Sequence, residues 1–188
     1  MARGADLIPM QVFSRFSPAA CGGSEPCVSA FFSDVIAAME RVIVLSRSHR
    51  IASVNLSLGG GQFTRACNTA DATMRAMTRL IRNLSDRRIA TVIASGNDGS
   101  NSFVNAPGCI STAVTVGSTT KADSVSGFSN HTRLVDLMAP GSDITAPILG
   151  SRFRRRQRDV DGHAACGRRL GADAERSRPR RWPRSRPR

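Results

Sequence analysis

Hydrophobic residues recur along the first 150 positions in two patterns, one typical of helices and one typical of buried strands. Apolar side chains spaced three or four residues apart predict amphipathic helices over 28–43 and 70–84. Short continuous apolar runs, several of them followed by glycine, predict strands at 7–13, 51–58, 89–94, 111–116 and 134–138. Strands that are apolar on both faces and alternate with helices indicate an α/β fold with a parallel sheet.

Two of the predicted strands end in polar and glycine residues. Ser57–Gly60 closes one strand and Ser95–Gly99 follows another. Parallel α/β sheets place their binding sites at the carboxyl ends of strands, and glycine at such an end lets the chain turn and a ligand approach closely. The pattern predicts a site here, although many doubly wound folds share this feature.

Several segments resemble motifs of the subtilisin-like serine peptidases (subtilases), in the order in which that family has them. Val54–Gly60 is similar to the strand and Ser-Leu-Gly edge that pairs with substrate backbone, and Ala94–Gly99 is similar to the segment that holds the oxyanion-hole Asn. Asn105–Gly108 and Val114–Ser118 are similar to the pocket wall and strand that follow in the family, and further similar segments are Arg3–Leu7, Phe128–Asn130 and Leu137–Gly141. The resemblance implies a partial, three-layer, doubly wound parallel sheet of the subtilisin type, with residues 1–150 as a partial peptidase domain.

The resemblance also implies a chemistry, the hydrolysis of peptide bonds in a polypeptide substrate by an Asp-His-Ser triad. It assigns Asn97 as the side-chain donor to the oxyanion; taken without its neighbours, Asn97 would be interpreted as a turn residue. The substrate-binding residues that it implies are Ser57, Leu58, Gly59, Ser95 and Gly96.

The segments that carry the triad in the family have no counterpart in these 188 residues. There is no Asp-Ser/Thr-Gly strand end, no His-Gly-Thr-His segment and no Gly-Thr-Ser-Met-Ala segment. His49, His131 and His163 match no family motif, and we expect them at the surface. The sequence therefore predicts a chain that begins after the first two triad members, loses the pattern before the third and is inactive as given. A non-catalytic peptide-binding remnant is the alternative.

The formal charge of +13 lies mostly at the C-terminal end of the chain. Residues 151–188 carry a net charge of +10 and all their basic residues are arginine, whereas residues 1–150 carry +3. A strongly basic chain would otherwise indicate nucleic-acid binding, which remains an alternative for the arginine-rich segment alone. Because 151–188 shows neither a helical nor a strand period, we predict a disordered tail.

Residues 157–171 suggest an origin for this tail. Codons can be chosen for them so that reading one nucleotide later gives Ser-Gly-Thr-Ser-Met-Ala-Thr-Pro-His-Val-Ala-Gly-Ala-Trp, the subtilase nucleophile segment. The second base of each codon fixes the first base of the shifted codon, so agreement over the whole run is not expected by accident. Our hypothesis is that 151–188 is a frameshifted translation, with the shift between 147 and 157. A second hypothesis is that Met1 is an internal start.

Cysteine usage suggests a secreted parent enzyme. Cys21–Cys27 and Cys67–Cys109 are the predicted disulfides, with free buried thiols as the alternative because connectivity cannot be deduced from sequence. No zinc-ligand spacing occurs, and no cofactor is identifiable; the resemblance allows calcium, but no acidic cluster identifies a site. No apolar run reaches about 18 residues, so no membrane span is expected. The chain does not open with a signal-peptide pattern.

Overall fold

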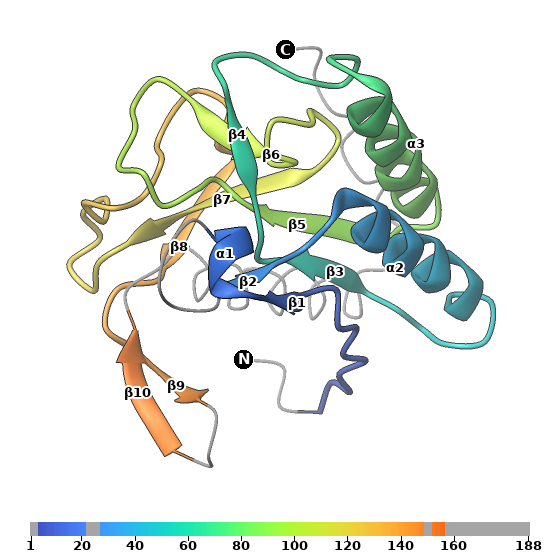
Figure 1. Cartoon of the computed structure of the whole chain (residues 1–188), viewed down its shortest axis with the longest axis horizontal. Coiled ribbons are helices and arrows are strands. Elements are labelled where there is room, and N and C mark those ends of the chain that lie inside the picture. Colours follow the sequence, from blue (N-terminus) through green and yellow to red (C-terminus); the bar gives the residue numbers. More distant parts are fainter. Residues whose placement is uncertain (1–3, 22–26, 149–151, 157–188) are drawn as a thin grey trace. The chain divides into compact units, whose positions relative to one another are not determined.

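The computed structural model describes residues 4–21, 27–148 and 152–156, which fall into two compact units divided at Arg50 (Figure 1). The larger unit is built on a four-stranded parallel sheet with the strand order β3-β5-β7-β8. Its strands are β3 (Ser53–Leu56), β5 (Ala90–Ala94), β7 (Val114–Thr119) and β8 (Leu137–Pro140). The predicted α/β class with a parallel sheet is confirmed.

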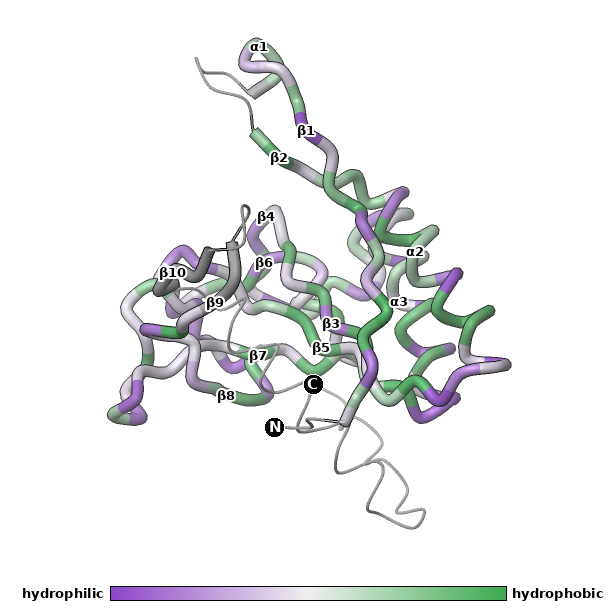
Figure 2. The backbone as a smooth tube through the Cα atoms, turned by 90° about the horizontal axis from the view of Figure 1, so that it is seen from below, coloured by the Kyte–Doolittle hydropathy of each residue, from purple (hydrophilic) through white to green (hydrophobic). Residues whose placement is uncertain are grey.

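Helix α3 (Ala72–Asp86) connects β3 to β5 and packs against β5. It begins where the Asp71 side chain accepts a hydrogen bond from the backbone N–H of Met74 at 2.8 Å, which satisfies one of the free N–H groups of the first turn. The predicted apolar stripe is confirmed from Met74 onward as the buried face of this helix, whereas Ala70 is exposed and precedes it. Figure 2 shows hydrophobic and hydrophilic residues alternating along the tube of α3. The buried residues are Met74, Met77, Thr78, Ile81 and Leu84.

The core of the sheet is made by small and β-branched side chains from neighbouring strands. Val92 of β5, Val116 of β7 and Ala139 of β8 are buried together, with Val114 packed against them. Because β5 and β7 are inner strands of a parallel sheet, both of their faces are buried, and β5 accordingly appears in the sequence as a largely apolar run. β7 also buries the polar residues Thr115, Ser118 and Thr119.

The smaller unit, Gly4–Arg50, contains a hairpin and a helix. Strands β1 (Ser14–Phe16) and β2 (Cys27–Ser29) pair antiparallel, with the short helix α1 (Pro18–Cys21) between them. Helix α2 (Phe32–Leu45) follows, and the rings of Phe16 and Phe31 meet edge to face with their centroids 5.6 Å apart.

Two predictions for this unit are wrong. The apolar run 7–13 forms no strand, since its side chains are mostly exposed and the first pairing starts at Ser14. The helical stripe starts at Phe32 and not at position 28, because Val28 pairs in β2 and is 68% exposed. Within α2 the stripe is confirmed by the burial of Val35, Met39 and Val42.

Two further antiparallel pairs were not predicted. Strand β4 (Gly60–Phe63) pairs with β6 (Val104–Ala106), and β9 (Ile144–Ile148) pairs with β10 (Arg152–Arg156). These strands are short, and β10 is an arginine run, so neither pair has the alternation or apolar content that identifies strands in a sequence. Residues 152–156, at the start of the segment predicted to be a disordered tail, therefore form a paired strand. Residues 157–188 lie outside the described residues.

Candidate functional site

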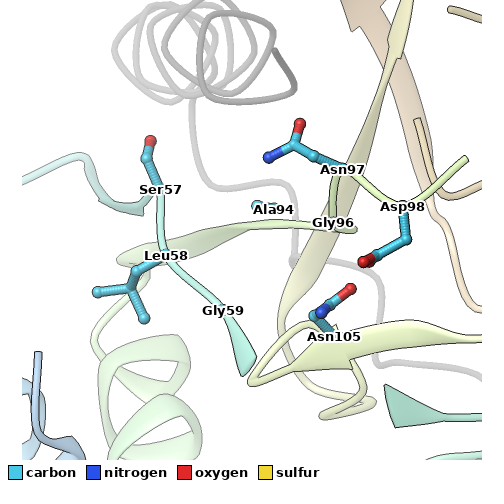
Figure 3. A pocket seen from close by; sticks show the side chains of 8 residues that line it. All are labelled: Ser57, Leu58, Gly59, Ala94, Gly96, Asn97, Asp98 and Asn105. Carbon is cyan, nitrogen blue, oxygen red and sulfur yellow. The ribbon is translucent and has the colours of Figure 1, made fainter. Parts of the chain in front are cut away.

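The carboxyl ends of β3 and β5 open into one pocket. Leu56, the last residue of β3, is paired with Ile93 of β5, so the segments that leave these two strands emerge side by side. The pocket has a volume of about 210 Å³. Its lining residues are Ser57, Leu58, Gly59, Ala94, Gly96, Asn97, Asp98 and Asn105 (Figure 3).

Most of the predicted site residues therefore lie together. Ser57 and Leu58 are half-buried and Gly59 is exposed on the β3 side of the pocket. On the β5 side the exposed side chain of Asn97 extends over the pocket, toward the side that Ser57 occupies (Figure 3). Gly96 precedes it with φ +120°, a backbone angle that residues with a β-carbon rarely adopt.

Ser95 is the predicted site residue that the structure does not place on the pocket wall. Its side chain is fully buried, and its hydroxyl donates to the backbone carbonyl of Asn130 at 2.8 Å. Its backbone N–H donates to the carbonyl of Val116 in the adjacent strand at 3.0 Å. Ser95 thus anchors the loop that leaves β5, and its hydroxyl points into the protein interior.

Strand β6 supplies a wall of the pocket, at the segment whose resemblance to subtilases implied a pocket wall. Asn105 lines the pocket, its backbone N–H donates to the carbonyl of Ser95 at 2.9 Å, and its side chain and that of Asp98 lie toward one another in Figure 3. A β-carbon on Gly59 would lie only 3.1 Å from Cβ of Asn105, so the two strand ends approach closely. Asn105 belonged to a recognised motif, but only the β4–β6 pairing brings it to the site.

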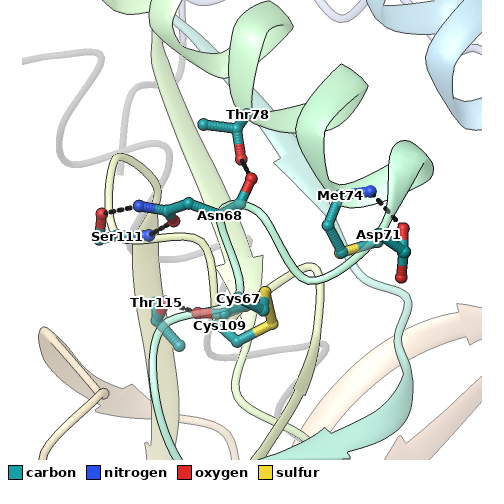
Figure 4. Close-up of a disulfide and its surroundings, with 9 residues drawn as sticks. Cys67, Asn68, Asp71, Met74, Thr78, Cys109, Ser111 and Thr115 are labelled. Atoms are coloured by element: carbon teal, nitrogen blue, oxygen red, sulfur yellow. Dashed lines mark hydrogen bonds between the residues drawn. A yellow bond between two sulfur atoms is a disulfide. The ribbon is translucent and has the colours of Figure 1, made fainter.

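The predicted disulfide Cys67–Cys109 is present and ties the loop after β4 to the loop after β6 (Figure 4). Its Cα atoms are 5.4 Å apart, and the backbone N–H of Cys67 donates to the carbonyl of Cys109 at 3.1 Å. Next to it, the Asn68 side chain makes two hydrogen bonds with Ser111, 2.8 and 2.9 Å long. Cys27 is disulfide-bonded, but the side chain of Cys21 lies outside the described residues, so that pairing stays a prediction.

Neither described histidine lines the pocket. His49 and His131 are exposed, as predicted, and His163 lies outside the described residues. In the part of the chain that the structure describes, no group of three or more His, Cys, Asp or Glu side chains is arranged to hold a metal ion. No helix within 4–21, 27–148 and 152–156 is long and apolar enough to cross a membrane.

Comparison with known proteins identifies the family to which this arrangement belongs. The sequence profile of the Subtilase family (Peptidase_S8) matches residues 5–172. The chain belongs to the subtilase family. The profile match covers most of the chain and ends within 151–188.

The subtilase chain is similar to secreted proteases over part of their length. It is 33% identical over 147 residues to an "Extracellular serine proteinase" of Thermus sp. (strain Rt41A), a match that covers 78% of this chain and 30% of that protein. It is 31% identical over 144 residues to "Alkaline serine exoprotease A" of Vibrio alginolyticus, covering 77% of this chain and 22% of that protein. The chain thus spans about a third or less of these relatives.

A solved structure shares the subtilase fold. The crystal structure of a cold adapted subtilisin-like serine proteinase superposes with a TM-score of 0.64 at 28% identity, covering 79% of this chain and 50% of that one. The sequence match and the structural match therefore agree that the chain belongs to a family of serine-type peptidases and shares its fold.

Proposed function

We propose that this chain supplies the substrate-binding edge and the oxyanion donor of a secreted, subtilisin-like serine endopeptidase. The observation that carries the proposal is that Ser57–Gly59 and Asn97 line one pocket at the ends of two adjacent parallel strands. Membership of the subtilase family supplies the reaction class, and the comparison with an extracellular relative supports the secreted location.

The two sides of the pocket would act on different parts of a substrate. Ser57–Gly59 follows the end of β3 and lines the pocket, and we propose that a substrate peptide adds to this edge through main-chain hydrogen bonds. The Asn97 amide would donate to the negative oxygen that develops when a peptide carbonyl is attacked. An amide donor suits this role because it carries no charge to be neutralised and is held in place before the reaction.

Cleavage further requires the Asp-His-Ser triad that the subtilase resemblance implies. The 188 residues contain none of the three motif segments, so we propose that this polypeptide by itself binds peptides but does not cleave them. We also propose that the third segment is encoded in the next reading frame, beneath residues 157–171. Sequencing the coding DNA tests this directly. Codons 157–171, read one nucleotide later, should encode the nucleophile segment, and any other encoded sequence would refute the frameshift hypothesis.

Peptide binding tests the assignment of the pocket. The ¹⁵N-labelled 188-residue chain is titrated with an extended peptide and with the same peptide methylated at its backbone nitrogens, which cannot form a main-chain ladder. We expect the backbone resonances of Ser57–Gly59 and the side-chain amide resonance of Asn97 to move with the first peptide only. Shifts confined to residues outside the pocket would contradict the proposed edge.

An active-site-directed fluorophosphonate tests the proposed lack of catalysis. The reagent reacts with an activated serine hydroxyl, and the proposal requires that the folded 188-residue chain remain unlabelled. Stoichiometric labelling of one serine in this chain would show that a nucleophile is present and that the triad assignment is mistaken.

A further inference from the structure

Asn130 is a fully buried side chain that lies directly behind the loop carrying Asn97. It belongs to the connection between β7 and β8, and its exposed fraction is 0%. A buried amide carries two N–H donors and an acceptor oxygen, and leaving any of them unpaired away from water is costly. The partners of Asn130 therefore show what its burial achieves.

All the side-chain hydrogen bonds of Asn130 lead to the loop after β5 and to its neighbour in β6. The side-chain oxygen accepts from the backbone N–H groups of Asp98 and Ser100, both at 3.0 Å. The side-chain nitrogen donates to the carbonyl of Ser95 at 3.2 Å, to Oδ1 of Asn105 at 2.7 Å and to Oδ2 of Asp98 at 3.1 Å. Residues 95–100 thus form a turn wrapped around one amide group.

The backbone of Asn130 completes this arrangement. Its N–H donates to the carbonyl of Gly96 at 3.1 Å, and its carbonyl accepts from the Ser95 hydroxyl at 2.8 Å. The Gly96 carbonyl and the Asp98 N–H belong to the peptide groups on either side of Asn97, and both are hydrogen-bonded to Asn130. Two flanking bonds, from Gly99 N–H to the Phe128 carbonyl and from His131 N–H to the Ser100 carbonyl, are each 2.8 Å long.

These hydrogen bonds fix the backbone on both sides of Asn97 and therefore the direction in which its side chain leaves the backbone. Asn97 is itself exposed, and the peptide groups on both sides of it are hydrogen-bonded to Asn130. A side-chain amide is required at position 130 because the site needs an acceptor for two N–H groups and a donor for two oxygens at once. Ala would provide neither, and an ionised Asp could not donate and would face the Asp98 carboxylate.

We propose that Asn130 is a positioning residue that holds Asn97 in the orientation needed to donate to the oxyanion. This inference rests on the proposed oxyanion role of Asn97. The hydrogen bonds themselves do not depend on that role, so the order of the loop and the function of Asn97 can be tested separately.

The test compares Asn130→Ala with Asn68→Ala in the ¹⁵N-labelled 188-residue chain. Asn68 is the matched control because its side chain also joins two segments by two hydrogen bonds, to Ser111, but it does not line the pocket. We expect Asn130→Ala to raise the amide exchange rates of Asp98 and Ser100 by about tenfold or more, since each loses its acceptor. The side-chain resonance of Asn97 should also move or broaden, whereas Asn68→Ala should leave both signals unchanged.

The outcomes separate the two proposals. Unchanged exchange at Asp98 and Ser100, or equal changes in both variants, would overturn the positioning role whatever Asn97 does. If exchange rises as expected in Asn130→Ala but peptide never moves the Asn97 resonance in the unaltered chain, Asn130 orders the loop and the oxyanion assignment fails, which also overturns the inference.

A gentler variant covers the case in which Asn130→Ala does not fold. Asn105→Ala removes one acceptor of the Asn130 amide from a half-buried position and leaves the amide itself in place. The inference requires that the Asn97 resonance move in Asn105→Ala while the urea midpoint falls no further than in Asn68→Ala. An unmoved resonance would overturn it.

Discussion

Replacing Gly96 by alanine should be among the most damaging single changes in the larger unit. Gly96 has φ +120°, and a β-carbon built on it would lie well under 3.0 Å from Oδ1 of Asn105 and Nδ2 of Asn130. These two atoms are hydrogen-bonded to each other at 2.7 Å, so the new methyl group would occupy the space of an existing bond. Neither side chain can retreat without giving up its own partners.

Three effects contribute to the cost of Gly96→Ala. A side chain at this positive φ costs roughly 1–3 kcal/mol, and forcing an extra methyl group into a packed site costs about 1–3 kcal/mol. Loss of the bond between Asn130 and Asn105 adds about 1 kcal/mol. We therefore expect the free energy of unfolding to fall by about 4 kcal/mol.

Urea unfolding followed by circular dichroism measures this loss. With a slope of about 2 kcal/mol per molar urea, the midpoint should fall by about 2 M. Gly60→Ala is the matched control, because nothing lies within 4 Å of a β-carbon there and its φ is not in the positive range. That variant should change stability by less than about 1 kcal/mol. If both variants unfold at the same urea concentration, the loop after β5 adapts freely and the close packing around Asn130 does not constrain it.

Two further predictions concern the scaffold that carries the pocket. Removing the Cys67–Cys109 disulfide by the Cys67→Ala and Cys109→Ala double variant should lower the free energy of unfolding by about 4 kcal/mol, because the bond closes a loop with a sequence separation of 42. Equal urea midpoints for the double variant and the unaltered chain under oxidising conditions would contradict this. Asp71→Ala should destabilise by about 1 kcal/mol through loss of the hydrogen bond to Met74 at the start of α3. Asp86→Ala, at the exposed end of the same helix, is the control and should change stability by less than about 0.5 kcal/mol.

The sequence predicted those parts of the site in which the functional residues follow one another within one continuous segment. Ser57–Gly59 and Asn97 each follow an apolar strand, and the resemblance to subtilases attached a role to each segment. The same reasoning placed Ser95 with them, whereas the structure turns its hydroxyl inward to the Asn130 carbonyl. A motif fixes which residues are neighbours in sequence, but the direction of each side chain depends on what packs behind the strand.

The secondary structure shows the same division. The stripes of α2 and α3 were recognisable because burial of one helix face imposes a period on the sequence, and the segments of β5 and β7 were recognisable because burial of both strand faces favours runs rich in apolar residues. The pairs β1–β2, β4–β6 and β9–β10 impose no such period. Their strands are short and are held by backbone hydrogen bonds, which depend little on the identity of the side chain.

The sequence by itself thus determined the α/β class, the main helices and inner strands, and the segments that border the pocket, whereas the Cys67–Cys109 disulfide was one of two alternatives that only the structure decided. Only the tertiary structure decided that Asn130, 32 residues beyond Asp98, orders the loop beside it. The physical reason is that hydrophobic burial leaves a recognisable pattern of apolar residues along the chain, whereas a hydrogen bond between distant polar groups leaves none until folding brings those groups together.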